Sequence, residues 1–227
     1  MSLLRRRDVG AGLLGAGLLA AFGPARAQAG PVEGVNYVRL VEPVPTSGGG
    51  KIEVIEFFWY ECPHCHTFEP ALEAWTQRLP PDVAFRRVPV WFREEPFGPQ
   101  QRLFYALESM GLLPTLHRRV FNAIHVDRVR LRSAEEITAF MLKNGVDAQT
   151  FLGVYNSFGV QSKALQARQT AAAYKIDAVP AMGVQGRFYT NGTLSNAGSA
   201  SARGSSNDRM LGVVDALVVR VRKGGKT

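Results

Sequence analysis

Residues 54–65 read VIEFFWYECPHC, an apolar run that ends in two cysteines three positions apart. The run is rich in β-branched and aromatic side chains, which predicts a central strand over residues 51–60. Residues 67–79 have the pattern of a helix, and two consecutive prolines follow them. The two thiols are therefore expected at a strand-to-helix junction, where backbone N–H groups and the helix dipole stabilise a thiolate.

Cys62 and Cys65 are the only cysteines of the 227-residue chain. A disulfide between them closes so short a loop that it removes little chain entropy, so stabilising the fold is a poor explanation for the pair. Thiol–disulfide exchange is the better interpretation. We expect Cys62, at the start of the helix, to be the exposed nucleophile with a low pKa. Cys65, one turn inside the helix, is expected to be the shielded resolving thiol.

His64 lies between the two cysteines, directly after Pro63. Its ring can donate a hydrogen bond or a positive charge to the Cys62 thiolate, although a plain solvated histidine is the alternative interpretation. The charge and the helix position both favour the reduced pair with its thiolate. Because a stabilised reduced form makes a disulfide a stronger oxidant, the motif indicates an oxidising redox pair.

The N-terminal segment has the pattern of an export signal. Residues 5–7 are arginines, residues 9–22 are apolar, and residues 25–27 read ARA, a small-x-small cleavage site. We expect residues 1–27 to be a signal peptide that is cleaved after Ala27. About fourteen apolar residues are few for a membrane span, so a retained anchor is the weaker alternative. The arginines leave twin-arginine export open beside the general secretory route.

The charge and the cysteine usage narrow the class of protein. The formal net charge is +8, and removal of four arginines and one aspartate with residues 1–27 leaves +5. The basic side chains are scattered, without a Lys/Arg cluster among aromatics, so nucleic-acid binding is not expected. Disulfides persist outside the cytoplasm, yet one possible pair does not make a disulfide-stapled scaffold. Such a chain is suited to handling the disulfides of other proteins.

Strand patterns occur in both halves of the chain. An extended lead-in over residues 28–50 precedes the central strand, and residues 83–91 alternate as a second strand. Residues 178–184 and 186–190 are typical of a hairpin around Gln185-Gly186. The sequence therefore predicts strands on either side of a long middle segment.

The middle segment, residues 99–174, shows helical periodicity, and we expect four or five helices there. Ser133 opens a capping box, Asn144-Gly145 is typical of a helix C-terminus, and Asp147 is typical of an N-cap.

The C-terminal region has two parts. Residues 191–207 are rich in glycine and serine and are expected to form a flexible loop. Residues 209–223 are expected to form a closing amphipathic helix.

The order of these elements predicts an α/β protein, with a thioredoxin-like fold and an inserted helical domain. The expected division is a signal peptide over 1–27, a first part of the thioredoxin-like domain over 28–98, a helical insertion over 99–174, and a second part over 175–227.

The motif at residues 57–65 is followed by Phe68-Glu69, and three later segments are Asn156-Ser157-Phe158, Ala171-Ala172-Ala173 and Val179-Pro180-Ala181-Met182. Together these segments resemble the DsbA family of periplasmic thiol:disulfide oxidants. The likeness covers most of residues 35–190, in the family's order.

The resemblance implies a protein dithiol oxidase that donates its Cys62–Cys65 disulfide to unfolded exported proteins with free thiols, promoting oxidative folding in the periplasm. It implies reoxidation by a DsbB-like membrane quinone reductase. It also implies a monomer that uses the redox-active disulfide without a further cofactor or metal. The alternatives are a periplasmic disulfide reductase or isomerase, and a non-redox peptide-binding chaperone module.

The resemblance also implies a second site at Val179 and Pro180. A cis peptide bond between them would lie opposite the cysteines and leave the backbone of residue 179 free to pair with a substrate strand. The alternative is a trans proline in an ordinary turn.

Two acidic residues and one arginine are expected near the cysteine pair. Glu56 lies in the apolar strand six residues before Cys62. A buried acid has a raised pKa, and we expect it to relay the proton of Cys65, unless it faces solvent at an edge. Glu69 matches an acid of the family but is also compatible with a surface helix position. Arg87 stands where some members have lysine, and it can act as an ion-pair partner but not as a proton carrier.

Residues 62–66 read CPHCH, which also fits the pattern of covalent haem attachment. A preceding strand argues against a small cytochrome, and without a second cysteine pair a zinc site is not expected. His66 is then a helix residue near the site. His117 and His125, in the helical segment, are assigned no role.

Overall fold

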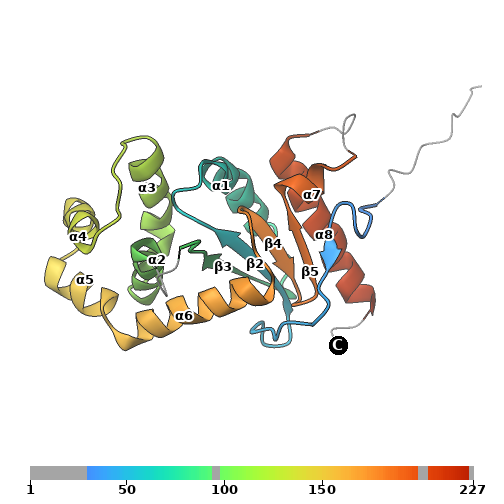
Figure 1. Cartoon of the computed structure of the whole chain (residues 1–227), viewed down its shortest axis with the longest axis horizontal. Helices are drawn as coiled ribbons and strands as arrows, with labels where there is room; N and C mark the ends of the chain where they lie inside the picture. The colour runs from blue at the N-terminus through green and yellow to red at the C-terminus, as the bar shows by residue number, and fades with distance from the viewer. Residues whose placement is uncertain (1–29, 94–97, 199–203, 225–227) are drawn as a thin grey trace, which may run out of the picture.

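The computed structural model describes residues 30–93, 98–198 and 204–224. The expected signal peptide, residues 1–27, lies outside the described residues. One five-stranded sheet has the order β1-β5-β4-β2-β3, in which β2 is parallel to β3 and every other neighbouring pair is antiparallel (Figure 1). The strands are β1 (Val38–Arg39), β2 (Ile52–Phe58), β3 (Val83–Pro89), β4 (Ala181–Val184) and β5 (Phe188–Asn191).

The helices account for most of the remaining chain. They are α1 (Pro63–Thr76), α2 (Pro99–Ser109), α3 (Leu113–His125), α4 (Ala134–Lys143), α5 (Ala148–Tyr155), α6 (Phe158–Ala173), α7 (Gly192–Asn196) and α8 (Ser206–Gly224). Helices α2 to α5 lie together at one end of the molecule, and α6 leads back to β4 (Figure 1). The predicted α/β fold with helices inserted between two parts of a thioredoxin-like sheet is therefore confirmed.

Strand β2 is the centre of the molecule, and all seven of its residues are buried. Because successive side chains of a strand point to opposite faces, the five apolar residues of β2 supply both faces of the sheet. Val54 packs with residues of α1 and α8 in one apolar cluster. Ile55 and Phe57 pack with the helical segment in another. Glu56 shares the face of Val54, which α1 covers, and this places its carboxylate under the active-site helix.

Two helices begin at the capping residues that the sequence predicted. The Ser133 hydroxyl accepts a hydrogen bond from Glu136 N at 3.2 Å, and the Asp147 carboxylate accepts one from Thr150 N at 2.8 Å, so both residues cap helices. The Glu136 carboxylate accepts from Arg132 N rather than from Ser133 N, so the predicted capping box is not reciprocal.

The turn between β4 and β5 requires glycine at one position for steric reasons. Gln185 and Gly186 both have positive φ angles, 52° and 61°, and they are the two central residues of a β-turn that is closed by a hydrogen bond of 3.0 Å from Arg187 N to Val184 O. A Cβ at Gly186 would lie 1.9 Å from Val44 O, so only glycine fits there. The predicted turn is confirmed.

The C-terminal loop prediction is wrong where the structure describes residues 191–207. Asn191 caps a short helix, α7, by accepting a hydrogen bond from Leu194 N at 2.9 Å. Helix α8 begins at Ser206, three residues earlier than expected. Helical hydrogen bonding overrides the loop-like composition here, and residues 199–203 lie outside the described part.

Other elements also differ in extent from the prediction: β2, β3 and β4 are each shorter than the predicted strands. Helix α1 begins at Pro63 rather than Thr67, because proline is well suited to the first helical turn, where its missing N–H leaves no bond unmade. The lead-in contributes the edge strand β1, whose Val38 pairs with Tyr189 of β5. Within the described ranges, no helix is both long enough and apolar enough to cross a membrane.

Candidate active site

The two cysteines lie at the start of α1 in different surroundings. Cys62 is the residue before the first helical position, and Cys65 lies within the first turn, completely buried. Both are free thiols. Cys62 is only 9% exposed, so the expectation of an exposed nucleophile is wrong for this form. The reason is a long-range contact, since the Cys62 thiol donates a hydrogen bond of 3.3 Å to the carbonyl of Val179.

The surroundings push the two thiol pKa values apart. The pKa of Cys62 is lowered to about 6, first by a hydrogen bond from the Cys65 thiol and, against the opposing effect of burial, by the backbone N–H groups of Cys65 and His64 and the charge of His64. Burial raises the pKa of Cys65 well above its usual value, and the Cys62 thiolate adds to the rise. The arrangement yields one nucleophilic thiolate and one protonated partner at neutral pH.

His64 is exposed at the start of α1, in line with its expected position. It acts on Cys62 both through its backbone N–H and through its charge. Pro63, before it, is also exposed. Pro63 and His64 are therefore accessible to a partner molecule, whereas Cys62 between the loop and the helix is not.

The peptide bond between Val179 and Pro180 is cis, as the resemblance implied. A cavity of about 510 Å³ lies beside it, with His64 and Thr67 of α1 on one side and Asn207 and Met210 of α8 on the other. The cavity therefore borders both the helix that carries the cysteines and the segment whose carbonyl contacts Cys62.

A buried ion-pair network lies beneath α1. Arg87 Nε of β3 is 3.0 Å from Glu56 Oε2 of β2, and Arg87 Nη2 is 2.5 Å from Glu69 Oε1 of α1. Glu56 is fully buried and Glu69 is 4% exposed, which rules out the solvent-facing alternatives for both acids. Arg87 is an ion-pair partner, as expected.

The two carboxylic acids of this network titrate differently. Burial raises the pKa of Glu56 to about 8, and the negative charge of Glu69 adds to the rise, against the opposing charge of Arg87. Burial also pushes the pKa of Glu69 upward, but the hydrogen bond and charge of His117, together with Arg87, lower it overall. At neutral pH, Glu56 is thus the protonated member and Glu69 the anion.

His117 is the residue of this network that the sequence did not reveal. Its Nδ1 is 2.7 Å from the Tyr60 hydroxyl, and its Nε2 is 3.5 Å from Glu69 Oε1. Burial lowers its pKa, so the ring is neutral. A neutral ring protonated at Nε2 suits both neighbours, since its Nδ1 accepts a hydrogen bond from the Tyr60 hydroxyl and its Nε2–H faces the Glu69 carboxylate.

The sequence held one weak signal for this role. His117 falls within the apolar stripe of α3 that Leu116, Val120 and Phe121 form, and all three are buried. A polar residue in such a stripe needs a partner. Nothing in the local sequence says that the partners are Glu69 and Tyr60, because they lie 48 and 57 residues earlier in the chain.

His125 also joins the helical segment to the active site. Its Nε2 is 2.8 Å from the carbonyl of Tyr60, two residues before Cys62, and its ring stacks on His66 of α1 with centroids 4.9 Å apart. His66 is therefore near the site as expected, and α3 supports the loop that precedes Cys62. Among the described residues, no group of three or more His, Cys, Asp or Glu side chains is arranged to hold a metal ion.

Comparisons with known proteins agree with this geometry. Residues 53–202 match the family model for the DSBA-like thioredoxin domain. The thiol:disulfide interchange protein DsbA of Azotobacter vinelandii is 42% identical over 222 residues, which cover 96% of this chain and 99% of that protein. The DsbA of Burkholderia cepacia is 38% identical, over 92% and 94% of the two chains.

Solved structures show the same relationship in three dimensions. The crystal structure of Pseudomonas aeruginosa DsbA superposes with a TM-score of 0.76 and 37% identity, over 86% of this chain and 97% of that one. DsbA from Xylella fastidiosa superposes with a TM-score of 0.74 and 30% identity, over 85% and 98%. This chain belongs to the DsbA family of thiol:disulfide oxidoreductases, with the thioredoxin-like fold and helical insertion of that family.

Proposed function

We propose that this protein is a periplasmic dithiol oxidase that donates a Cys62–Cys65 disulfide to newly exported proteins. The observation that carries the proposal is the unequal environment of the two thiols. The pKa of Cys62 is lowered to about 6 while that of Cys65 is raised. Stabilising the Cys62 thiolate stabilises the reduced pair, and a disulfide whose reduced form is stabilised is a strong oxidant.

The reaction begins with the oxidised pair. A substrate thiolate attacks the sulfur of Cys62, the Cys62–Cys65 bond breaks, and Cys65 leaves with the electron pair. A second substrate thiolate then attacks the substrate sulfur of the mixed disulfide and releases Cys62 as a thiolate. The substrate loses two electrons and two protons and gains a disulfide, and the enzyme pair takes up both electrons. One proton remains on Cys65 and the other passes to solvent.

Glu56 is the proposed proton source for Cys65. It is buried, its pKa is raised to about 8, and its charge acts on the Cys65 thiol. A protonated Glu56 can neutralise the Cys65 thiolate as it leaves, and Arg87 holds the resulting carboxylate. His64 and Pro63 belong to the proposed site through their place between the cysteines. Val179 belongs to it through the contact of its carbonyl with Cys62, and Pro180 through the cis bond that joins it to Val179.

The proposed enzyme acts on exported proteins in the periplasm. Unfolded exported proteins with free thiols are the proposed substrates, since the helix and loop around Cys62 border an open cavity. A DsbB-like membrane quinone reductase would return the reduced pair to the disulfide. Residues 1–27 would direct export to the periplasm and be cleaved after Ala27, and the enzyme would act as a monomer with its disulfide as the only redox group.

The test is the redox potential of the Cys62–Cys65 pair, measured on residues 28–227 equilibrated with defined glutathione buffers. A value well above about −180 mV, more oxidising than protein disulfide isomerase, is expected. A value near about −270 mV, as in thioredoxin, would make the protein a reductase. A variant with Cys62→Ser and Cys65→Ser should fail to oxidise reduced secreted proteins, and rescue of their folding by this variant would point to a chaperone.

A further inference from the structure

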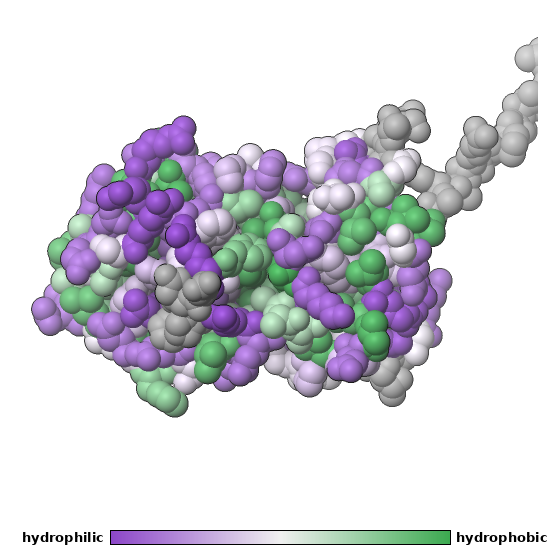
Figure 2. Space-filling model, viewed as in Figure 1, coloured by the Kyte–Doolittle hydropathy of each residue, from purple (hydrophilic) through white to green (hydrophobic). Residues whose placement is uncertain are grey.

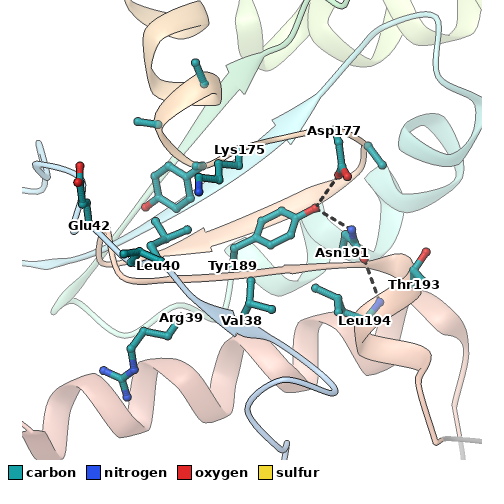
Figure 3. Close-up of a pocket in the computed structure, with 15 residues that line it drawn as sticks. Val38, Arg39, Leu40, Glu42, Lys175, Asp177, Tyr189, Asn191, Thr193 and Leu194 are labelled. Carbon is teal, nitrogen blue, oxygen red and sulfur yellow. Dashed lines mark hydrogen bonds between the residues drawn. The ribbon is translucent and has the colours of Figure 1, made fainter.

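A second cavity, of about 760 Å³, lies next to the active site on the side of α6 (Figure 3). It is bounded by β1 and the residues after it, by the end of α6 and the segment that follows, by β5 and by α7. The reaction described above does not use it.

The inside of this cavity is mainly apolar. Figure 3 shows Leu40 and the Tyr189 ring at its centre, with Val38 and Leu194 beside them. The polar ends of the lining side chains contact one another, since the Tyr189 hydroxyl accepts a hydrogen bond of 2.7 Å from Asn191 Nδ2. Apolar surface also gathers over the middle of the molecule, where the sheet lies (Figure 2). The site therefore suits an apolar group better than an ion.

The charges near the cavity include both signs. Lys175 and Asp177 lie along one side, and Glu42 lies at one end (Figure 3). Arg39 forms an ion pair with Glu33 at 3.0 Å. Charges of both signs at the edge favour neither an anionic nor a cationic small molecule, in agreement with an apolar occupant.

The second cavity adjoins the cavity that borders the Val179–Pro180 bond. Ala178, Asn191 and Thr193 line both cavities. Ala178 directly precedes Val179, whose carbonyl contacts the Cys62 thiol. Lys175, with a φ of 54°, follows the C-terminal end of α6 and turns the chain toward that contact. A polypeptide that lies against Val179 can therefore cross Ala178 and Thr193, both exposed, and enter the second cavity.

We propose that the second cavity binds an apolar side chain of the substrate polypeptide, a few residues away along the chain from the cysteine that reacts with Cys62. The inference rests on the proposed function and adds a second point of attachment to it. An unfolded chain exposes such side chains, and a folded chain buries them. Binding there would give unfolded substrates an advantage that small thiols lack.

The test uses oxidised residues 28–227 and two thiols. One is a 15-residue unstructured peptide with a central cysteine and leucine and phenylalanine residues on both sides, and the other is a tripeptide with one cysteine. Second-order rate constants for mixed-disulfide formation are measured by rapid mixing. The quantity of interest is the ratio of the long-peptide rate constant to the tripeptide rate constant.

Ala172→Trp is the variant, since Ala172 is exposed on α6 and lines the second cavity only. Gln169→Trp is the matched control, because Gln169 is exposed on the same helix and lines neither cavity. We expect Ala172→Trp to lower the ratio about tenfold, the effect of one partly buried apolar side chain. The control should leave the ratio unchanged, and so should Ala172→Trp when serines replace the apolar residues of the peptide.

Two other results would overturn the inference. A wild-type ratio near one, or an unchanged ratio in Ala172→Trp, would show that no part of the peptide uses the cavity. Failure of the wild-type protein to transfer its disulfide to either thiol is a separate result, which would reject the proposed function as well. Thr193→Asp provides a second variant at the shared boundary, and it too should lower the ratio if the peptide crosses there.

Discussion

The hydrogen bond between the two thiols is the first cause of the lowered pKa of Cys62. Cys65 can donate this bond because it is buried and keeps its proton. The exposed His64 side chain acts on Cys62 only through its charge, and that effect comes after the thiol and backbone N–H donors. At the scale of single residues, the reactivity of Cys62 therefore depends on Cys65 before it depends on the residues between them.

Two substitutions of Cys65 should change the pKa of Cys62 by different amounts. Cys65→Ala removes the donor and should raise the pKa of Cys62, whereas Cys65→Ser keeps a hydroxyl donor and should change the pKa less. A hydrogen bond to a charged group is worth about 1.5–3 kcal/mol, or about one to two pH units of difference between the variants. Thiolate absorbance near 240 nm against pH gives both midpoints. Equal titration midpoints in the two variants would show that the helix N-terminus lowers the pKa of Cys62 without a contribution from a donor at position 65.

The raised pKa of Glu56 predicts a pH-dependent stability. Between the usual carboxyl range and a pKa of about 8, the native state binds one proton more than the unfolded state, so stability falls as pH rises through this window. Glu56→Gln removes the effect. The free energy of unfolding of the reduced wild type, relative to this variant, should fall by up to about 1.4 kcal/mol per pH unit from pH 5 to 8.

Urea unfolding of both proteins at each pH measures this difference. Glu42→Gln is a control, since Glu42 is exposed and should leave the pH dependence unchanged. A constant difference between wild type and Glu56→Gln over the whole range would mean that Glu56 is ionised at pH 5 and cannot be the proton source.

His117→Leu leaves the Tyr60 hydroxyl and the Glu69 carboxylate without their shared partner. Because an unsatisfied buried polar group costs about 1–3 kcal/mol, the variant should be destabilised by at least this amount. His117→Gln retains a donor and an acceptor and should lose less. Denaturant unfolding at pH 7 compares the two, and an equal loss would assign the effect to packing alone.

At the scale of elements, α3 and α1 hold the active-site loop between them. His125 of α3 contacts the Tyr60 carbonyl, and His66 of α1 stacks on His125. The helical segment thus contributes to the position of Cys62, although its residues are distant in sequence. Where such helices begin is set locally, by side chains that accept from free N–H groups of the first turn.

Ser133 tests this local control. Its hydroxyl accepts from Glu136 N at 3.2 Å at the start of α4. Ser133→Ala should lower the free energy of unfolding by about 1 kcal/mol, and Ser133→Asn, which keeps a capping side chain, should cost much less. Thermal unfolding followed by circular dichroism measures both. A similar loss in the two variants would mean that tertiary packing, rather than the cap, fixes the start of α4.

At the scale of the whole molecule, redox state and stability are linked. If the native protein stabilises the reduced pair, as proposed, the reduced protein must be more stable than the oxidised one by the same free energy. Each 30 mV by which the native potential exceeds that of the unfolded chain corresponds to about 1.4 kcal/mol. Guanidinium unfolding of the two forms at pH 7 measures the difference. A more stable oxidised form would contradict the oxidase proposal.

Much of this molecule could be predicted from local patterns. The run at residues 52–58 is apolar on both faces, so it predicts a central strand, and the positions of Cys62 and Cys65 relative to it predict a thiol pair at a helix start. The hairpin turn, the caps at Ser133 and Asp147 and the five helices of the middle segment follow from signals a few residues long. Such signals act through backbone hydrogen bonds and side-chain periodicity, which are local.

The amino-acid sequence by itself determined the strand, the helix that carries the cysteines, the order of elements and the chemistry of the motif. Only the tertiary structure decided that Val179 covers Cys62, that Arg87 joins two acids, and that His117 reaches Glu69 from another helix. Burial and long-range contacts decide which acid keeps its proton, and no short stretch of sequence records them. The second cavity has the same origin, because β1, β5, α6 and α7 enclose it only after the chain has folded.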